Sequence, residues 1–264
     1  MIIPIGCCVL PDQIRSLQAA GADYCELSIS GAVMNGGPDA FELLKEQVAG
    51  LQPKLLAYNV FLPSSLKIVG PEVDRSQLES YVGQAFSRIR QLSVPGRPIV
   101  VMGSGRSRSI PETFSREVAL DQLAEFLAWA GTLAQQHGVT LALEPLRRAE
   151  SNVFNTISEA GMFLRERQLG ALGLVADLYH MMAEHESLTT ITAYADLIVH
   201  AHVADGNQRL PPGQSNYPIA EFLRSLRESG YQGACSIECT WQDFASEIGP
   251  ALATMREQAR QAGW

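Results

Sequence analysis

Residues 139–177 read VTLALEPLRRAESNVFNTISEAGMFLRERQLGALGLVAD and contain the pattern on which the fold depends. Two short runs, Val139–Glu144 and Gly173–Asp177, have the length and apolar composition of buried strands. Between them, Ile157–Arg167 carries apolar residues at helical spacing. A strand, a helix and a second strand in this order predict two parallel strands joined by a helical crossover.

The same alternation extends from this stretch in both directions. The expected strands are Ile2–Cys8, Tyr24–Ile29, Lys54–Phe61, Pro98–Met102, Val139–Glu144, Gly173–Asp177, Ile198–Val203 and Ala234–Cys239. The expected helices are Asp12–Ala20, Pro38–Ala49, Arg75–Leu92, Arg116–His137, Ile157–Arg167, Tyr179–Tyr194, Ile219–Ser229 and Phe244–Ala262. Eight such units with right-handed crossovers predict an α/β fold, a single-domain (β/α)8 TIM barrel over residues 1–264. A doubly wound open sheet is the alternative, but no glycine-rich dinucleotide fingerprint follows the first strand.

The composition narrows the class of protein. The chain is 46% hydrophobic and 18% charged, which fits a soluble globular protein. Its formal net charge of −8 argues against general nucleic-acid binding, because phosphate backbones attract basic surfaces. No stretch reaches the ~20 apolar residues of a membrane span, and the first residues lack the basic lead of a signal peptide. We therefore expect no nucleic-acid partner, no membrane partner and a cytoplasmic location.

The five cysteines are odd in number and include no CxxC pair. We expect them to be buried thiols in a reducing compartment. Zinc binding by Cys7 and Cys8 is the less favoured alternative, because structural zinc sites place a spacer between paired cysteines.

Two segments, Gly103–Ser115 and Ala204–Pro218, show no regular pattern. Both follow expected strands. In a barrel the loops after the strands form the catalytic mouth, so we expect these two segments to serve the substrate.

Ionisable residues stand at the ends of four consecutive expected strands. Because the carboxyl ends of parallel barrel strands share one rim, these side chains are expected to converge on a divalent metal ion. The expected ligands are Glu144, Asp177, His202 and Glu238. Three carboxylates and one imidazole form an oxygen-rich set, for which Mn²⁺ is the expected ion and Mg²⁺ or Co²⁺ the alternatives.

Two further histidines lie near this rim. His200 precedes His202 by two residues and points to the same side of the strand, one layer deeper, where a supporting role is favoured over a ligand. His180 follows Asp177 by three residues, an offset that brings its imidazole over the rim to bond a substrate hydroxyl.

Glu144 and Glu238 would flank the ion from opposite sides. Such a pair can remove a proton alpha to a polarised carbonyl and return one after an enediolate has formed. The residues thus predict a metal-dependent isomerase or epimerase that needs no redox cofactor.

The chain resembles the xylose-isomerase-like TIM-barrel superfamily, and within it the ketose 3-epimerases. The motifs that carry the resemblance are Leu143-Glu144-Pro145-Leu146 with Glu150, Asn155-Thr156, Asp177-Leu-Tyr-His180, His200-Ala-His202-Val-Ala-Asp205 and Ile237-Glu238, together with Gly103-Ser104-Gly105 and Glu26. The resemblance implies that Glu144 and Glu238 are both metal ligands and the acid/base pair. It also implies substrate contacts at Glu150, His180 and Arg209, and a sugar or sugar phosphate as the substrate.

Three positions depart from the usual epimerase pattern. An Arg147-Arg148 pair replaces Asn-Arg, Arg209 is displaced within its loop, and no proline follows Glu238 before Cys239-Thr240-Trp241. These positions hold substrate in the family, so the resemblance leaves the identity of the sugar open.

Two interpretations apply to each of three further charged residues. Arg106 and Arg108 could hold a substrate phosphate through their guanidinium groups, or lie in a solvated loop. Glu26 points either into the barrel or toward the substrate, and we favour a role in a polar substrate pocket because an unpaired buried carboxylate is costly.

Other functions compete on the same site. A hydroxypyruvate isomerase or an inosose dehydratase-type lyase would use the same base. A non-catalytic binding barrel is disfavoured by the complete ligand set, and an endonuclease IV-type DNA-repair enzyme by the small number of histidines and the acidic charge. Pairing into a homo-oligomer is possible for such barrels, but nothing in the sequence decides it.

Overall fold

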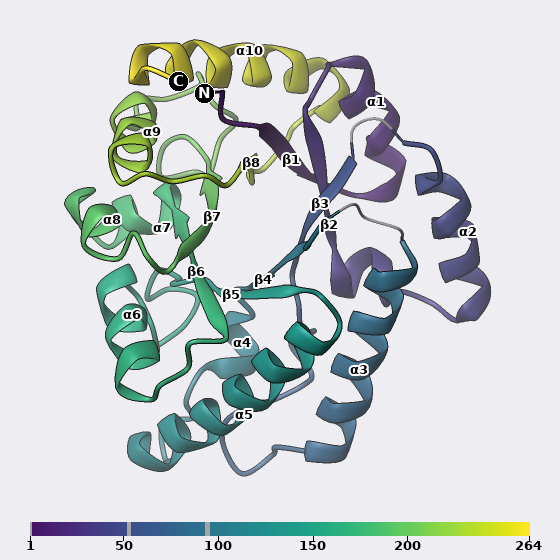
Figure 1. The fold of residues 1–264 in the computed structure, drawn as a ribbon, viewed down its shortest axis with the longest axis vertical. Helices are drawn as coiled ribbons and strands as arrows, with labels where there is room; N and C mark the ends of the chain where they lie inside the picture. The colour runs from purple at the N-terminus through teal and green to yellow at the C-terminus, as the bar shows by residue number, and fades with distance from the viewer. Residues whose placement is uncertain (1, 52–53, 93–95) are drawn as a thin grey trace.

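A computed structural model describes residues 2–51, 54–92 and 96–264, and these fold into one closed barrel (Figure 1). Each strand pairs in parallel with the next along the chain, and β1 also pairs with β8. This closure confirms the predicted (β/α)8 barrel and excludes the open sheet. The strands are β1 (Ile5–Val9), β2 (Tyr24–Ser28), β3 (Lys54–Asn59), β4 (Ile99–Met102), β5 (Thr140–Leu143), β6 (Leu172–Asp177), β7 (Ile198–Val203) and β8 (Cys235–Ile237).

Helices surround the barrel and connect successive strands (Figure 1). They are η1 (Pro11–Gln13), α1 (Ile14–Ala19), the π-helical turn η2 (Ile29–Val33), α2 (Pro38–Val48), α3 (Arg75–Gln91), α4 (Gly105–Arg108), α5 (Arg116–Gln136), α6 (Ile157–Glu166), α7 (Leu178–Ala183), α8 (Thr189–Ala193), α9 (Ile219–Glu228) and α10 (Phe244–Ala262). β7 and α10 match the expected bounds at both ends, and most other elements differ from theirs by a few residues. Among the described residues, no helix combines the length and apolar character needed to cross a membrane.

The single helix expected over Tyr179–Tyr194 is wrong, because this segment forms α7 and α8 with a break between them. The break contains Glu186, whose carboxylate accepts the backbone N–H groups of Ile157 at 3.0 Å and Ser158 at 3.2 Å. His185 beside it has a φ of 54°, outside the helical range. Glu186 thus accepts hydrogen bonds from backbone N–H groups in the first turn of α6, which have no partner within that helix. The segment around Glu186 is not helical, and this brings its side chain to α6.

The segment Gly103–Ser115, expected to be irregular, contains the short helix α4. Ser104 precedes this helix in the left-handed conformation, with φ 43° and ψ 43°, and its hydroxyl oxygen accepts the N–H of Leu62 at 3.1 Å. The second such segment, Ala204–Pro218, is irregular as expected, apart from a bridge between Asp205 and Leu210.

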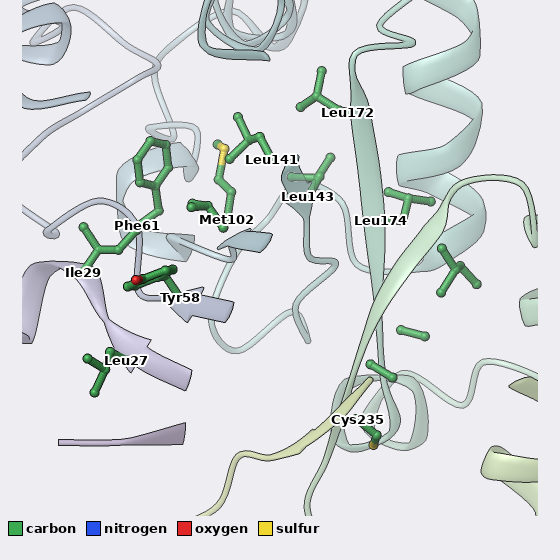
Figure 2. Packing of buried hydrophobic residues seen from close by; sticks show 14 of the residues in the cluster. Leu27, Ile29, Tyr58, Phe61, Met102, Leu141, Leu143, Leu172, Leu174 and Cys235 are labelled. Carbon is green, nitrogen blue, oxygen red and sulfur yellow. The ribbon is translucent and has the colours of Figure 1, made fainter. Parts of the chain in front are cut away.

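Alternation along the strands separates an outer apolar layer from the barrel interior. The outward-facing side chains pack against the helices in one large cluster, part of which Figure 2 shows with Leu141 and Leu143 beside Met102. The inward-facing Val101, Ala142 and Val175 form a small separate cluster inside the barrel. Most other inward positions toward the carboxyl ends of the strands are polar, and there the candidate site lies.

Candidate metal centre and substrate cavity

Four ionisable side chains from consecutive strands meet at the carboxyl end of the barrel. The Nδ1 atom of His202 lies 3.0 Å from Oε1 of Glu144 and 3.2 Å from Oε2 of Glu238. Oδ2 of Asp177 lies 4.0 Å from the same nitrogen. One ligand atom from each of the four residues falls within 4.8 Å of the others, so the structure brings the whole expected ligand set together.

The chemistry of these groups fits a divalent cation. Three carboxylates in a buried space repel one another, and a cation offsets this repulsion. Burial raises the pKa of Glu144. Burial alone would also raise the pKa of Glu238, but Arg209 and His202 outweigh it and lower that pKa to about 2. The two glutamates therefore have unlike environments, and the oxygen-rich set suits Mn²⁺, Mg²⁺ or Co²⁺.

The two carboxylate oxygens of Asp177 make different contacts: one caps a helix and the other faces the candidate metal centre. Its Oδ1 accepts the N–H groups of Tyr179 at 2.7 Å and His180 at 3.3 Å, which caps the start of α7. Its Oδ2 is the atom that faces His202. The end of β6 and the start of α7 thus fix the carboxylate in one orientation.

Glycine makes room for Glu144 at the end of β4. A Cβ atom at Gly103 would lie 2.4 Å from Oε2 of Glu144, and one at Gly105 would lie 2.5 Å from the carbonyl oxygen of Glu150. Both distances are too short for any side chain. The Gly103-Ser104-Gly105 motif therefore lets the β4 loop lie against the carboxylate and the segment after β5.

Arg209 lies against Glu238. Its guanidinium donates to Oε2 of Glu238, and its Nε–H donates to the carbonyl oxygen of the same residue at 3.2 Å. The loop that carries Arg209 is held by the buried Asp205, whose carboxylate accepts backbone N–H groups from Gly213, Ser215 and Tyr217 at 2.8–3.0 Å. The β7–α9 loop thus delivers the arginine to the centre.

The two ring nitrogens of His180 have different surroundings: Nδ1 is hydrogen-bonded, whereas Nε2 lies 3.8 Å from Oδ2 of Asp177, beyond hydrogen-bonding distance. Its Nδ1 accepts the N–H of Arg147 at 3.2 Å, so the ring carries its proton on Nε2 when neutral. Nε2 is buried and has no hydrogen-bond partner among the described residues. The expected substrate residue Glu150 lies nearby, and its Oε1 accepts from Nε of Arg147 at 2.8 Å.

These groups open on a cavity of about 530 Å³. On one side its wall is ionisable. On the other it is made mostly of small polar and apolar residues from the end of β3 and the loops after β2, β3 and β4, with Arg106 as the one ionisable residue among them. The ionisable side comprises Glu144, Glu150, His180, Arg209 and Glu238, and the other includes Ser30, Asn59, Val60, Leu62, Ser64, Gly103, Ser104 and Arg106.

The two arginines considered for phosphate binding lie in different places. Arg106 is exposed and lines the cavity. Arg108 is fully buried and donates to the carbonyl oxygens of Met102 at 3.3 Å and Phe154 at 3.4 Å. Both of its Nη groups bond the backbone and Arg108 does not line the cavity, so it is not placed to bind a phosphate there.

Glu26 lies beneath the cavity and is not on its wall. Its carboxylate contacts Nε2 of His202 at 3.0 Å, Nε2 of His200 at 2.9 Å and the hydroxyl of Ser236 at 2.6 Å. The sequence did not reveal this contact with His202, nor the hydrogen bond from Asn59 to Oε1 of Glu238 at 3.4 Å. Strand alternation places both residues on the inner face, and this is the signal that could have pointed to Asn59.

Comparison with known proteins gives a consistent match. A family model described as a xylose isomerase-like TIM barrel matches residues 14–261. The chain is 31% identical over 171 residues to a 3-dehydro-D-guloside 4-epimerase of Escherichia coli K12, covering 62% of this chain and 65% of that protein. It is 29% identical over 143 residues to a D-psicose 3-epimerase of Agrobacterium fabrum, covering 49% and 48%. These matches span less than two thirds of either relative.

Among solved structures, that of an L-ribulose 3-epimerase superposes with a TM-score of 0.84 at 20% identity. The superposition covers 99% of this chain and 96% of that one. At this identity the likeness establishes the fold.

Proposed function

The chain belongs to the xylose isomerase-like TIM barrel family, and on that premise we propose that it is a metal-dependent sugar epimerase. The reaction we propose inverts a carbon next to a ketone carbonyl in a ketose or keto-sugar. The observation that carries the proposal is the pair Glu144 and Glu238, which face one cavity and flank Nδ1 of His202 at 3.0 and 3.2 Å.

The names of the two curated relatives describe related chemistry. A D-psicose 3-epimerase inverts C3, next to the C2 ketone of the sugar, and a 3-dehydro-D-guloside 4-epimerase inverts C4, next to the oxidised C3. In both reactions the proton that moves is attached to the carbon beside a ketone. This shared step supports a keto-sugar substrate for the present chain.

The two glutamates divide the proton transfer between them. One carboxylate accepts the proton of the carbon beside the carbonyl, and the bonding electrons move onto the carbonyl oxygen to give an enediolate. The carboxyl group of the other glutamate then donates a proton to the opposite face of that carbon. One group must begin ionised and the other protonated, and the Arg209 guanidinium that donates to Oε2 of Glu238 favours the ionised form of that group.

Three other residues hold the substrate in this proposal. Nε2–H of His180 donates to a substrate oxygen, which provides the buried donor with the acceptor that it lacks. On the cavity wall, Arg209 donates to one substrate hydroxyl and Glu150 accepts from a neighbouring one, which orients the carbon between the glutamates. Arg106 stands at the exposed part of the wall, where it would meet a charged or extended end of the sugar.

Glu144, Asp177, His202 and Glu238 would hold the ion, with Mn²⁺ as the expected metal. A divalent cation bound there supplies positive charge that polarises the carbonyl and stabilises the enediolate oxygens.

The test is proton exchange in D₂O with free ketoses and 3-keto glycosides. We expect the Mn²⁺-loaded protein to place deuterium on the carbon beside the ketone and to invert it, and the EDTA-stripped protein to do neither until Mn²⁺ is restored. Equal turnover by stripped and loaded protein would exclude the metal mechanism. Loss of water from the sugar without inversion would indicate a dehydratase.

A further inference from the structure

A connected set of polar side chains fills the barrel interior directly below the candidate metal centre. It comprises Tyr24 and Glu26 of β2, His200 and His202 of β7, and Ser236 of β8. Each of these residues is at most 2% exposed. Branched apolar side chains usually fill this part of a barrel, and buried polar groups are costly unless they are hydrogen-bonded. The arrangement of the hydrogen bonds indicates what this layer does.

The side-chain carboxylate of Glu26 acts as an acceptor in each of its contacts with the histidines and Ser236. Its Oε1 lies 3.0 Å from Nε2 of His202, and its Oε2 lies 2.9 Å from Nε2 of His200. The hydroxyl of Ser236 donates to the same Oε2 at 2.6 Å. A carboxylate is an acceptor only, so both imidazoles present Nε2–H to it. Nδ1 of His200 has no partner among the described residues, as expected if the ring proton is on Nε2.

Tyr24 completes the chain of donors at its far end. Because the Ser236 hydroxyl donates to Glu26, its oxygen accepts the Tyr24 hydroxyl, at 2.6 Å. The tyrosine ring occupies the space in which a side chain at position 6 would begin, since a Cβ atom at Gly6 would lie 2.5 Å from its Cζ atom. The absence of a side chain at Gly6 therefore leaves space for the Tyr24 ring, whose hydroxyl bonds Ser236.

The contact with Glu26 decides which nitrogen of His202 faces Glu144 and Glu238. With Nε2–H donated to the glutamate, Nδ1 is the nitrogen left to bind a cation, and it already points at Glu144 and Glu238. A carboxylate behind a metal-binding imidazole fixes the ring orientation and increases its basicity.

We propose that Glu26 is a positioning residue that holds His202 with Nδ1 toward the metal centre, and that His200 and Ser236 in turn hold Glu26. The role rests on the proposed function, because it requires a cation at the centre.

One other interpretation of the same residues is less well supported. Cys8, Glu26 and His202 also place one ligand atom each within 4.8 Å of one another, as a second ion would require. However, both oxygens of Glu26 already accept hydrogen bonds, one of them from Nε2 of His202. We therefore assign Glu26 to positioning, with one cation bound per chain.

The experiment measures Co²⁺ binding to metal-free protein by titration calorimetry and by the visible spectrum of the bound ion. The variants are Glu26→Gln, which keeps the size but removes one acceptor, and Glu26→Asp, which keeps the carboxylate on a shorter stem. Tyr24→Phe is the matched control, because it removes a buried hydrogen bond of the same layer while the Ser236 hydroxyl keeps its own hydrogen bond to Glu26. Thermal unfolding of each metal-free variant reports separately on the fold.

We expect Glu26→Gln to weaken Co²⁺ binding about 10- to 100-fold and to change the cobalt spectrum, with Glu26→Asp weakened less. Tyr24→Phe should lower the melting temperature yet keep affinity and spectrum close to wild type. Wild-type affinity in Glu26→Gln, an equal loss in Tyr24→Phe, or two Co²⁺ per chain overturns the positioning role and leaves the proposed function standing. Wild-type protein that binds no Co²⁺ overturns both. Should Glu26→Gln fail to fold, the comparison of Glu26→Asp with Tyr24→Phe decides by the same criteria.

Discussion

The carboxylate of Glu144 occupies the space next to the α-carbon of Gly103, where a Cβ atom would lie 2.4 Å from Oε2. A methyl group at this position has to displace either the carboxylate or the backbone of the β4 loop. Gly103→Ala is therefore expected to weaken metal binding and turnover about 10- to 100-fold, as for other losses of ligand support. Calorimetric titration with Mn²⁺ measures the first effect and steady-state kinetics the second.

Gly83→Ala is the control for this substitution. Gly83 lies in α3, and a Cβ atom there would have no neighbour within 4 Å. Alanine in a helix interior should raise the free energy of unfolding by about 0.5–1 kcal/mol and leave metal affinity unchanged. Unchanged affinity in both variants would mean that the β4 loop yields without disturbing the glutamate.

The two glutamates are expected to be individually indispensable. Glu144→Gln and Glu238→Gln each remove one proton-transfer group, which should lower kcat on the order of 10²- to 10⁴-fold. Glu46→Gln, an exposed position on α2, serves as the matched control. Deuterium incorporation without inversion in one variant would identify the other glutamate as the group that removes the proton. Full inversion by either variant would exclude the paired mechanism.

Asp205 is expected to affect substrate binding without touching the substrate. Asp205→Ala deprives three backbone N–H groups of their acceptor and loosens the loop that carries Arg209. We expect KM to rise several-fold, with a loss of stability of about 1–3 kcal/mol. Kinetics and urea unfolding measure the two effects. A change in stability with an unaltered KM would show that Arg209 is held by Glu238 alone.

Alkaline pH should destabilise the protein through its buried thiols. Burial raises the pKa of Cys235 from 9.0 to about 12. The unfolded thiol ionises above pH 9 while the folded thiol stays neutral, so its stabilising contribution is fully present below pH 9 and is lost as the pH rises toward 12. The slope for one such group approaches about 1.4 kcal/mol per pH unit.

Urea unfolding between pH 8 and pH 11 tests this dependence. Cys235→Ala should be less stable than wild type at pH 8, because it leaves a small void in the core, yet lose stability less steeply as the pH rises. Parallel curves for the two proteins would assign the alkaline loss to other groups.

The barrel and the convergence of Glu144, Asp177, His202 and Glu238 were predictable because both follow from local order. β5 to β8 are apolar runs that each lead into an ionisable residue, and parallel strands bring such ends together without further information. The break between α7 and α8 was not predictable, since it depends on Glu186 reaching the start of α6.

Side-chain contacts between residues distant in sequence were likewise not predictable. Glu26 is separated by 174 residues from His200 and by 176 from His202, and its neighbours are set by closure of the barrel. Arg108 differs from Arg106 because α4 turns its side chain inward, which the Gly-Ser-Gly sequence before it did not indicate.

The two halves of the barrel contribute different residues to the cavity wall. Under the proposed function, one half carries the residues of the reaction and the other determines which sugar fits. The segments after β5 to β8 carry Glu144, Glu150, His180, Arg209 and Glu238. The loops after β2, β3 and β4 supply most of the other side, with small residues such as Ser30 and Ser64 and the single ionisable residue Arg106. Under the proposed function, mutations in those loops change the space for the sugar and leave Glu144 and Glu238, the proposed proton-transfer pair, unchanged. Proteins that descend from one such barrel can therefore acquire new substrates through mutations in the loops after β2, β3 and β4. Directed evolution of this chain should begin in those loops.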